Sequence, residues 1–479
     1  MELTKLTIAE TSKKLKNKDI SVIELVKSYM QKIEKLNETI NAYITICNEG
    51  IEEHSKALQK KLDSGDDLPV LFGIPMALND NIITRNILTT CASKMLRNFI
   101  PPYDSAVNEK LRDEGAILLG KLNMDEFAIG NSNENSYFGL VKNPQNFERV
   151  PGGSSGGAAS AVASGMARFA LGSDTGGGIR QPASFCGVVG LKPTYGLVSR
   201  YGLVASASSM DQIGPITRNV EDCATVLNAI TGYDPKDSTS ANIKYPDYTS
   251  FLIDDIKGMK IGIHRDYIEK DTNSQVKQKI LDACSILESL GAEIVEVSLP
   301  TTEYAIAAHY IISSAETSSN LARYDGIRYG YRAENYEDLE SLYSKTRGQG
   351  FGTEAKRRIL LGTYVLSSGH YDEYYKKALK ARQLIINDYK KAFEYVDVIV
   401  SPTTPETAFK IGEKQDGLHN LYSSNAYTVS ASLAGLCAMS IPIGKDSEGL
   451  PIGMQLIGKH YGEGTLIKVA NKFEEYMQF

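Results

Sequence analysis

A regular spacing of apolar side chains near the start of the chain predicts an amphipathic helix over residues 22–36. Four of them recur at intervals of three and four residues: Ile23, Val26, Met30 and Ile33. This interval places them on one face of an α-helix. Ser21, followed three positions later by Glu24, has the pattern of a capping box, so we expect the helix to begin directly after Ser21.

A continuous apolar run from residue 71 to 78 predicts a buried strand, because strands covered on both faces do not alternate with polar residues. Three polar residues, Asn79, Asp80 and Asn81, follow at once. Position 79 therefore lies at or just after the end of a strand, where functional side chains are often found.

Two glycine-dense stretches flank a segment of small residues. Residues 151–157 read PGGSSGG, and residues 172–180 read GSDTGGGIR. Between them, the small residues 158–164 suit a helix that packs closely against its neighbours and ends at Gly165. A short strand over residues 168–171 then enters the second glycine stretch.

The second half of the chain continues the alternation of strands and helices. Residues 235–250 are polar and contain proline, which predicts a loop or linker. Beyond it we expect the following elements: strand 259–263, helix 276–290, strand 293–297, helix 372–393 and strand 396–400. This order predicts an α/β fold, with a sheet covered by helices, in one continuous body.

Composition narrows the class of protein without naming a function. The 479 residues are 42% hydrophobic and 23% charged, as in ordinary globular proteins. A net charge of −6 provides no overall attraction to a nucleic-acid backbone. The six cysteines are scattered without a Cys-x-x-Cys pair, so neither a zinc site nor a disulfide framework is expected. Neither a signal-peptide pattern nor a membrane-spanning run is present, so we expect a cytoplasmic protein without membrane contact.

Two familiar glycine motifs fit this chain poorly. Residues 152–156 formally match the Gly-x-Ser-x-Gly nucleophile elbow, but that elbow needs a strand leading directly into it. The preceding residues, 148–151, are few and end in proline. The segment 348–352 has the wrong glycine spacing for a dinucleotide-binding loop.

Taken together, the two glycine stretches and the small-residue segment between them resemble the amidase signature family. Its members carry GGSSGG followed by DTGGSIR. The resemblance extends over nearly the whole chain, and several other segments share it: 72–75, 120–127, 191–196, 211–215, 323–330 and 356–359. Within the family these segments are most similar to the A subunits of aminoacyl-tRNA amidotransferases.

The resemblance implies a single α/β domain over 1–479, with a central mixed sheet surrounded by helices. We divide it into an N-terminal helical part (1–65), a signature core (66–235) and a C-terminal α/β part (251–479).

The resemblance also implies a catalytic triad, of which this chain keeps one member. In the family a serine attacks the carboxamide, a second serine in a cis peptide relays the proton, and a lysine acts as base. The relay serine corresponds to Ser154, but the nucleophile position holds Gly178 and the lysine position holds Asn79. Glycine has no atom that can form an acyl-enzyme, and asparagine cannot take up a proton at neutral pH. We therefore expect this chain to lack glutaminase activity.

Other site residues follow from the same resemblance. The backbone of Thr175, Gly176 and Gly177 is expected to form an oxyanion hole, which needs no side chain. Ser155 and Arg358 are expected to contact the substrate. The family's acidic residue for the substrate ammonium group corresponds to Asn425, so that contact loses its charge.

The resemblance further implies partners. In such amidotransferases the A, B and C subunits form a heterotrimer. The A subunit frees ammonia from glutamine and passes it to the B subunit, which uses ATP and magnesium to activate the substrate on tRNA. No cofactor or metal is expected in this chain itself, and tRNA is met only through the complex.

Three hypotheses follow from these observations. The first is an A-subunit-like chain that keeps its fold but cannot hydrolyse glutamine. The second is a working amidotransferase or amidase with a rebuilt site, although Ser154 and Ser155 lack an evident base. The third is a binding protein that uses the altered pocket for glutamine or a related small amide or acid.

Overall fold

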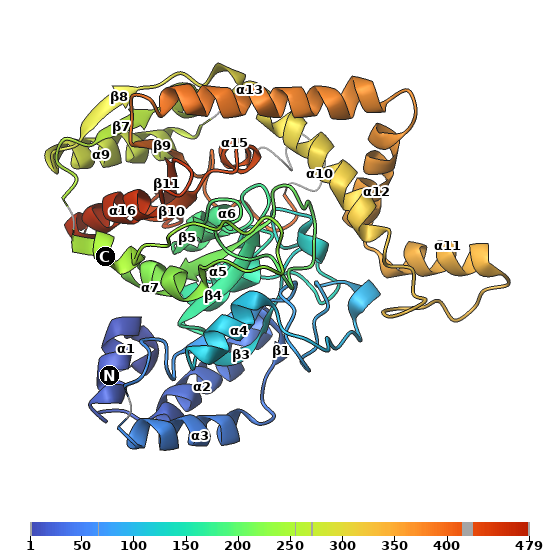
Figure 1. Cartoon of the computed structure of the whole chain (residues 1–479), viewed down its shortest axis with the longest axis horizontal. Helices are drawn as coiled ribbons and strands as arrows, with labels where there is room; N and C mark the ends of the chain where they lie inside the picture. The colour runs from blue at the N-terminus through green and yellow to red at the C-terminus, as the bar shows by residue number, and fades with distance from the viewer. Residues whose placement is uncertain (1, 66, 254, 270–271, 414–424, 478–479) are drawn as a thin grey trace.

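Eleven strands form one mixed sheet in the computed structural model, which describes residues 2–65, 67–253, 255–269, 272–413 and 425–477 (Figure 1). The strand order is β1-β3-β2-β4-β6-β5-β10-β11-β9-β7-β8. Strand β2 is parallel to β3 and β4, and β7 is parallel to β8 and β9, whereas the strands between these groups pair antiparallel. The predicted α/β fold with a mixed sheet is confirmed.

The strands come from all three parts of the chain. Their bounds are β1 (Tyr43–Ile46), β2 (Pro75–Asn79), β3 (Ile117–Leu122), β4 (Phe169–Asp174), β5 (Val189–Lys192), β6 (Gln212–Thr217), β7 (Lys260–Ile263), β8 (Glu293–Glu296), β9 (Val398–Pro402), β10 (Ala438–Lys445) and β11 (Pro451–Gly458). The part expected to be helical, 1–65, thus also contributes an edge strand, β1, which pairs with β3. Pairing of β5 with β10 joins the two halves of the sheet.

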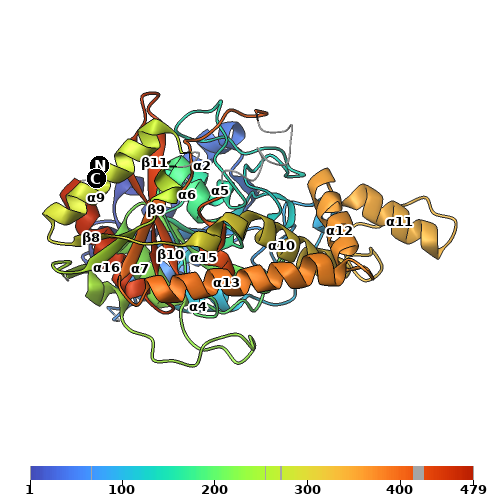
Figure 2. The same cartoon turned by 90° about the horizontal axis from the view of Figure 1, so that it is seen from above.

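Helices cover the sheet on both sides (Figure 2). The helices of the first half are α1 (Ile8–Lys16), α2 (Val22–Ile40), α3 (Ile51–Asp63), α4 (Ala106–Asp113), α5 (Gly156–Ala163), α6 (Arg180–Cys186) and α7 (Val220–Ile230). Those of the second half are α8 (Asp266–Glu269), α9 (Ser274–Ser289), α10 (Ala305–Leu321), α11 (Leu339–Gly350), α12 (Thr353–Leu366), α13 (Lys376–Ala392), α15 (Val429–Leu433) and α16 (Glu463–Met477). None of the helices in the described ranges is both long enough and apolar enough to span a bilayer.

The predicted elements are present, with shifted ends. Helix α2 begins at the predicted capping box and runs four residues further than expected, to Ile40. The apolar run 71–78 becomes a strand only from Pro75, because Gly73 adopts a φ of +74° and turns the chain before it. The helix predicted over 372–393 is α13, preceded by a short π-helical turn over Tyr371–Tyr375.

Helices α10, α11, α12 and α13 form a group beside the sheet (Figure 1). Helix α10 contacts both α12 and α13, and α11 lies farthest from the sheet. Close packing of α10 and α12 depends on Gly362, where a Cβ atom would lie 2.0 Å from the carbonyl oxygen of Ser314. The two helices therefore meet backbone to backbone.

Candidate active site

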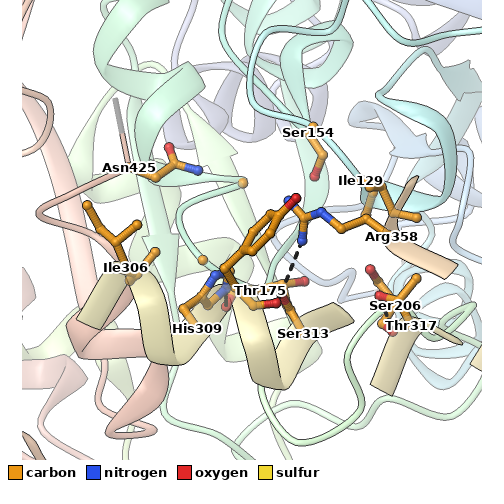
Figure 3. A pocket seen from close by; sticks show the side chains of 16 residues that line it. Ile129, Ser154, Thr175, Ser206, Ile306, His309, Ser313, Thr317, Arg358 and Asn425 are labelled. Atoms are coloured by element: carbon orange, nitrogen blue, oxygen red, sulfur yellow. Dashed lines mark hydrogen bonds between the residues drawn. The ribbon is translucent and has the colours of Figure 1, made fainter. Parts of the chain in front are cut away.

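A cavity of about 50 Å³ lies where the second glycine stretch meets α10 and α12 (Figure 3). Six of the predicted site residues line it: Ser154, Thr175, Gly176, Gly178, Arg358 and Asn425. They come from segments far apart in the sequence. The cavity is thus the place where the fold brings the predicted site together.

A buried ion pair fixes the glycine stretch beside the cavity. The Arg180 guanidinium donates from Nε to Asp174 Oδ2 (3.0 Å) and from Nη2 to Asp174 Oδ1 (2.9 Å), and both side chains are fully buried. The same carboxylate accepts hydrogen bonds from the N–H groups of Gly177 (2.8 Å) and Ile179 (3.2 Å). Burial favours a raised pKa, but Arg180 outweighs it and lowers the pKa of Asp174 to about 2. The pair therefore stays ionised and holds the turn of the chain.

The glycines of this stretch allow close approach by other elements. A Cβ atom at Gly176 would lie 2.4 Å from Nε2 of His309, and one at Gly177 would lie 2.3 Å from Oγ1 of Thr428. Thr175 and Gly176 line the cavity, whereas the N–H of Gly177 is used by Asp174. The oxyanion hole expected from the backbone of Thr175, Gly176 and Gly177 stays a prediction.

Ser154 and Gly178 lie next to each other in the wall of the cavity. The peptide bond between Gly153 and Ser154 is cis, and the Ser154 side chain is buried. A Cβ atom at Gly178 would lie 2.8 Å from Ser154 Oγ and 2.7 Å from the carbonyl oxygen of Ser173. The predicted relay serine and the predicted nucleophile position are thus direct neighbours, and position 178 presents backbone only.

Asn79 lies at the end of β2, as predicted, and is fully buried. Its Nδ2 donates to Ser155 Oγ at 2.8 Å. The Ser155 hydroxyl in turn donates to the carbonyl oxygen of Ser173 (3.1 Å) and accepts from the Ser173 N–H (3.2 Å). Asn79 and Ser155 are therefore hydrogen-bonded within a buried network. Neither is among the residues that line the cavity. The substrate contact expected of Ser155 stays a prediction.

Arg358 reaches the cavity from α12. Its side chain is only 8% exposed, its Nη1 donates to Ser313 Oγ (3.1 Å), and its Nε donates to Glu354 Oε1 (3.3 Å). The guanidinium also lies over the ring of Tyr310, 4.2 Å from the ring centroid. A planar cation held on several sides suits a carboxylate ligand.

Asn425 borders the cavity from the segment before α15 (Figure 3). Its backbone carbonyl accepts hydrogen bonds from the N–H and the hydroxyl of Thr428, both at 3.1 Å. Its side-chain Oδ1 is buried and has no hydrogen-bond partner among the described residues. A buried acceptor left without a donor is costly, so this oxygen favours a ligand that brings one.

One wall of the cavity, supplied by α10, was not predicted from the sequence. Five lining residues belong to this helix: Ile306, His309, Tyr310, Ser313 and Thr317. Their intervals of three and four residues are a helical periodicity, and a polar stripe of this kind is the signal that would have found them. His309 Nε2 lies 3.3 Å from the carbonyl oxygen of Thr175. Burial and the charge of Arg358 lower the pKa of His309 to about 4, so its imidazole is neutral at pH 7.

Two buried lysines near this region do not reach the cavity. Lys121 Nζ donates to the carbonyl oxygen of Ile82 (2.7 Å) and to Thr89 Oγ1 (2.8 Å), and lies 3.8 Å from Asp80 Oδ1. Lys192 Nζ donates to the carbonyl oxygen of Pro193 (2.8 Å). Neither lysine is among the lining residues. Among the residues that the structure describes, no cluster of three or more potential metal ligands occurs.

The chain matches a protein family and named relatives over most of its length. The family model described as Amidase matches residues 24–467. The chain is 56% identical to the A subunit of glutamyl-tRNA(Gln) amidotransferase from Thermoanaerobacter pseudethanolicus, over 100% of this chain and 98% of that protein. It is 54% identical to the protein of the same name from Persephonella marina, over 100% and 99%.

Solved structures show the same fold over the whole length. The A subunit of glutamyl-tRNA(Gln) amidotransferase from Thermotoga maritima superposes with a TM-score of 0.81 at 38% identity, covering 99% of this chain and 95% of that one. The peptide amidase of Stenotrophomonas maltophilia superposes with a TM-score of 0.83 at 30% identity, covering 99% and 97%. The sheet, the glycine stretches and the matched range together identify this chain as a member of the amidase signature family.

Proposed function

We propose that this chain is an A-subunit-like component of a glutamyl-tRNA(Gln) or aspartyl-tRNA(Asn) amidotransferase, and that it lacks glutaminase activity. The relatives that match it over its full length carry the name of the glutamyl-tRNA(Gln) amidotransferase A subunit, which supports the first part. In this proposal the chain assembles with B and C subunits in the cytoplasm and meets tRNA through them. ATP and magnesium are used by the B subunit.

The observation that carries the loss of activity is the bare backbone at position 178. Gly178 lies beside Ser154 in the cavity. The family resemblance assigns the attacking serine to this position. Hydrolysis through an acyl-enzyme requires that attacking atom. Asn79, at the position of the base, donates a hydrogen bond to Ser155 and has no basic atom. Removal of an activated nucleophile typically costs on the order of a millionfold in turnover.

A working amidase with a rebuilt site is the alternative, and its best support is that Ser154 and His309 line the same cavity. An imidazole next to a serine is a familiar way to activate a hydroxyl. However, burial and Arg358 lower the pKa of His309 to about 4, which makes it a weak base at neutral pH. The alternative therefore predicts slow glutamate release that His309→Gln abolishes.

The test is glutamate release from L-glutamine by the chain assembled with B and C subunits, beside the double variant Asn79→Lys/Gly178→Ser. We expect no release from the unchanged chain and measurable release from the double variant. A side chain at 178 requires Ser154 Oγ to rotate and the Ser173 carbonyl to shift, so the melting temperature of the variant is measured as a folding control.

Two outcomes contradict the proposal. Glutamate release by the unchanged chain refutes the loss of activity, and its sensitivity to His309→Gln then identifies the rebuilt site. Failure of the folded chain to form a complex with B and C subunits, seen by size-exclusion chromatography, refutes the role in such a complex.

A further inference from the structure

Helix α13 carries a concentration of positive charge that contrasts with the rest of the chain. Its 17 residues include six basic side chains and one acidic side chain, whereas the whole chain has a net charge of −6. The helix lies at an outer edge of the molecule, at the opposite end from α2 and α3 (Figure 1). A local patch of this sign can attract a polyanion although the protein as a whole is acidic.

Four of the six basic side chains on α13 are exposed and form no ion pair among the described residues: Lys377, Lys380, Lys390 and Lys391. The other two are used within the fold. Lys376 pairs with Asp372 at 2.6 Å, and Arg382 donates to a backbone carbonyl oxygen at 2.7 Å. Asp388, the acidic residue of the helix, accepts hydrogen bonds from the N–H and the hydroxyl of Thr301. The exposed charge of α13 is therefore positive.

Three of these lysines lie on one face of the helix, which we call the basic stripe. The stripe consists of exposed residues at intervals of three and four positions: Lys377, Lys380, Leu384, Asn387 and Lys391. It extends over about 21 Å along the helix axis. A lysine places a compact charge on a flexible stem, so a row of lysines suits a chain of phosphates better than a single small anion.

Exposed aromatic rings directly precede the stripe. Tyr364, near the end of α12, is 47% exposed, and Tyr371, in the π-helical turn before α13, is 39% exposed. The ring of His370 lies against Tyr364, with 4.1 Å between the ring centroids. Of the two acidic residues in the turn, Asp372 is paired and Glu373 is exposed. Exposed rings next to positive charge are typical of surfaces on which unpaired bases stack.

We propose that α13 binds RNA directly, with the lysines of the basic stripe on its phosphates and with Tyr364 and Tyr371 stacked on unpaired bases. Phosphates and bases together account for both features of this surface, whereas an acidic protein accounts only for the lysines. The ligand class is an RNA duplex that ends in unpaired nucleotides. The inference goes beyond the proposed function, in which tRNA is met through the other subunits, and rests on it only for the choice of RNA over DNA.

The test uses two synthetic RNA hairpins with the same duplex, one blunt and one with a short unpaired 3′ tail. Fluorescence anisotropy measures their binding to the unchanged chain, without B and C subunits, over a range of salt concentrations. We expect the tailed hairpin to bind at least about fivefold more tightly, because each stacked base contributes that much or more. Binding of both hairpins should weaken steeply as the salt concentration rises, because phosphate contacts release counter-ions.

The triple variant Lys377→Gln/Lys380→Gln/Lys391→Gln removes the charge of the basic stripe. It should weaken binding of both hairpins at least about tenfold, and the slope of log K against log salt should become smaller by about two. Equal effects on the two hairpins are expected, because phosphates are present in both.

The matched control is Lys27→Gln/Lys35→Gln/Lys60→Gln, which removes the same charge from exposed positions on α2 and α3. These helices lie at the opposite end of the molecule (Figure 1). The control should keep the salt slope of the unchanged chain. A difference between the two triple variants therefore reports on the stripe and not on net charge.

The double variant Tyr364→Ala/Tyr371→Ala tests the stacking. It should reduce the affinity for the tailed hairpin to that for the blunt one and leave the salt slope unchanged. A loss of folding would instead weaken both hairpins and lower the melting temperature, which is measured for every variant.

The proposal is overturned if the unchanged chain binds neither hairpin at low salt, or if the lysine triple variant binds as tightly as its control. Equal affinity of the unchanged chain for the two hairpins refutes the stacking, and tighter binding of a tailed DNA hairpin refutes the choice of RNA. Loss of assembly with B and C subunits in the triple variant, with RNA binding unchanged, would assign the stripe to a protein partner. Because RNA binding is measured without those subunits, its failure leaves the proposed function intact.

Discussion

Glu126 is a buried residue whose carboxyl group keeps its proton in the folded chain up to nearly neutral pH. Its side chain is buried, and its two carboxylate oxygens face the hydroxyl of Ser93 and the N–H of Gly352. Burial raises the pKa of Glu126 to about 7. The folded chain therefore holds a proton on this carboxyl group over a pH range in which the unfolded chain has released it. The stabilisation that protonated Glu126 gives the folded chain is fully present below the pKa that this group has in the unfolded chain. This stabilisation is lost as the pH rises through about 7.

We predict that the melting temperature falls as the pH rises from about 5 to about 8, and that Glu126→Gln makes this fall smaller. Glutamine resembles the protonated carboxyl group, with an oxygen for the Gly352 N–H and an NH₂ group for Ser93. The slope should not vanish, because burial also raises the pKa values of Asp125 and Glu474 to about 7. Thermal melts at several pH values measure the effect.

Glu38→Gln on the exposed side of α2 is the matched control and should leave the slope of the unchanged chain intact. An equal slope in the Glu126→Gln variant and the unchanged chain would contradict the prediction.

Local features of single residues could be predicted from the sequence, but contacts between distant segments could not. The capping box at Ser21 was predictable, because it depends on residues close together in the sequence. The close approaches at Gly176 and Gly177 were not, because the side chains that they meet, His309 and Thr428, lie far away along the chain. His309 was not predicted, because its importance depends on contact with a segment more than a hundred positions away. The hydrogen bond from Asn79 to Ser155 was missed for the same reason, because the two residues lie in segments far apart in the sequence.

At the scale of elements, the cavity depends on how α10 packs against α12. Helix α10 carries His309 and Ser313, and α12 carries Arg358, which donates to Ser313. Gly362 permits the close contact, because a Cβ atom there would lie 2.0 Å from the carbonyl oxygen of Ser314 and 2.5 Å from Cβ of Ser318. Backbone atoms cannot move aside as a flexible side chain does.

We predict that Gly362→Ala forces the two helices apart and costs about 1–3 kcal/mol of stability. Urea unfolding measures the loss of stability. Gly348→Ala is the matched control, because it also lies in a helix but meets nothing within 4 Å. It should be neutral or stabilise the chain by about 0.5–1 kcal/mol, through the helix propensity of alanine. Equal effects of the two substitutions would refute the packing argument.

Elements with strong periodicity or strong end signals were predictable from the sequence, whereas pairing partners were not. The unit β7-α9-β8 and the helix α5 were expected within a few residues of their observed bounds. Strand β1 was missed, because four residues show too little periodicity and gain their place only by pairing with β3. The strand order of the sheet likewise follows from tertiary contacts that no single segment encodes.

At the scale of the whole molecule, the sheet makes one body of two halves. The register of β5 with β10 pairs Lys192 with Ala438, and the buried Arg180 donates to Gln455 at 2.6 Å and to the carbonyl oxygen of Thr428 at 2.9 Å. The connection between the halves runs over the surface, where residues 242–244 are exposed. Covalent continuity at that point should therefore matter little once the sheet has formed.

We predict that a chain cut at a protease site introduced within residues 242–244 stays whole in solution. The two fragments should elute together in size-exclusion chromatography under native conditions and separate in urea, because buried strand pairing and the Arg180 contacts hold them. The uncut chain is the control for elution volume. Separation of the fragments without denaturant would show that the halves are independent.

The pairing of β5 with β10 also has a consequence for synthesis on the ribosome. Strand β5 is complete at Lys192, but its neighbour β10 begins only at Ala438. At translation rates of about 5–20 residues per second, the edge of β5 waits for roughly 10–50 s. An open strand edge is a template for wrong pairing with other chains. The nascent first half therefore exposes this unpaired edge until the second half has been made.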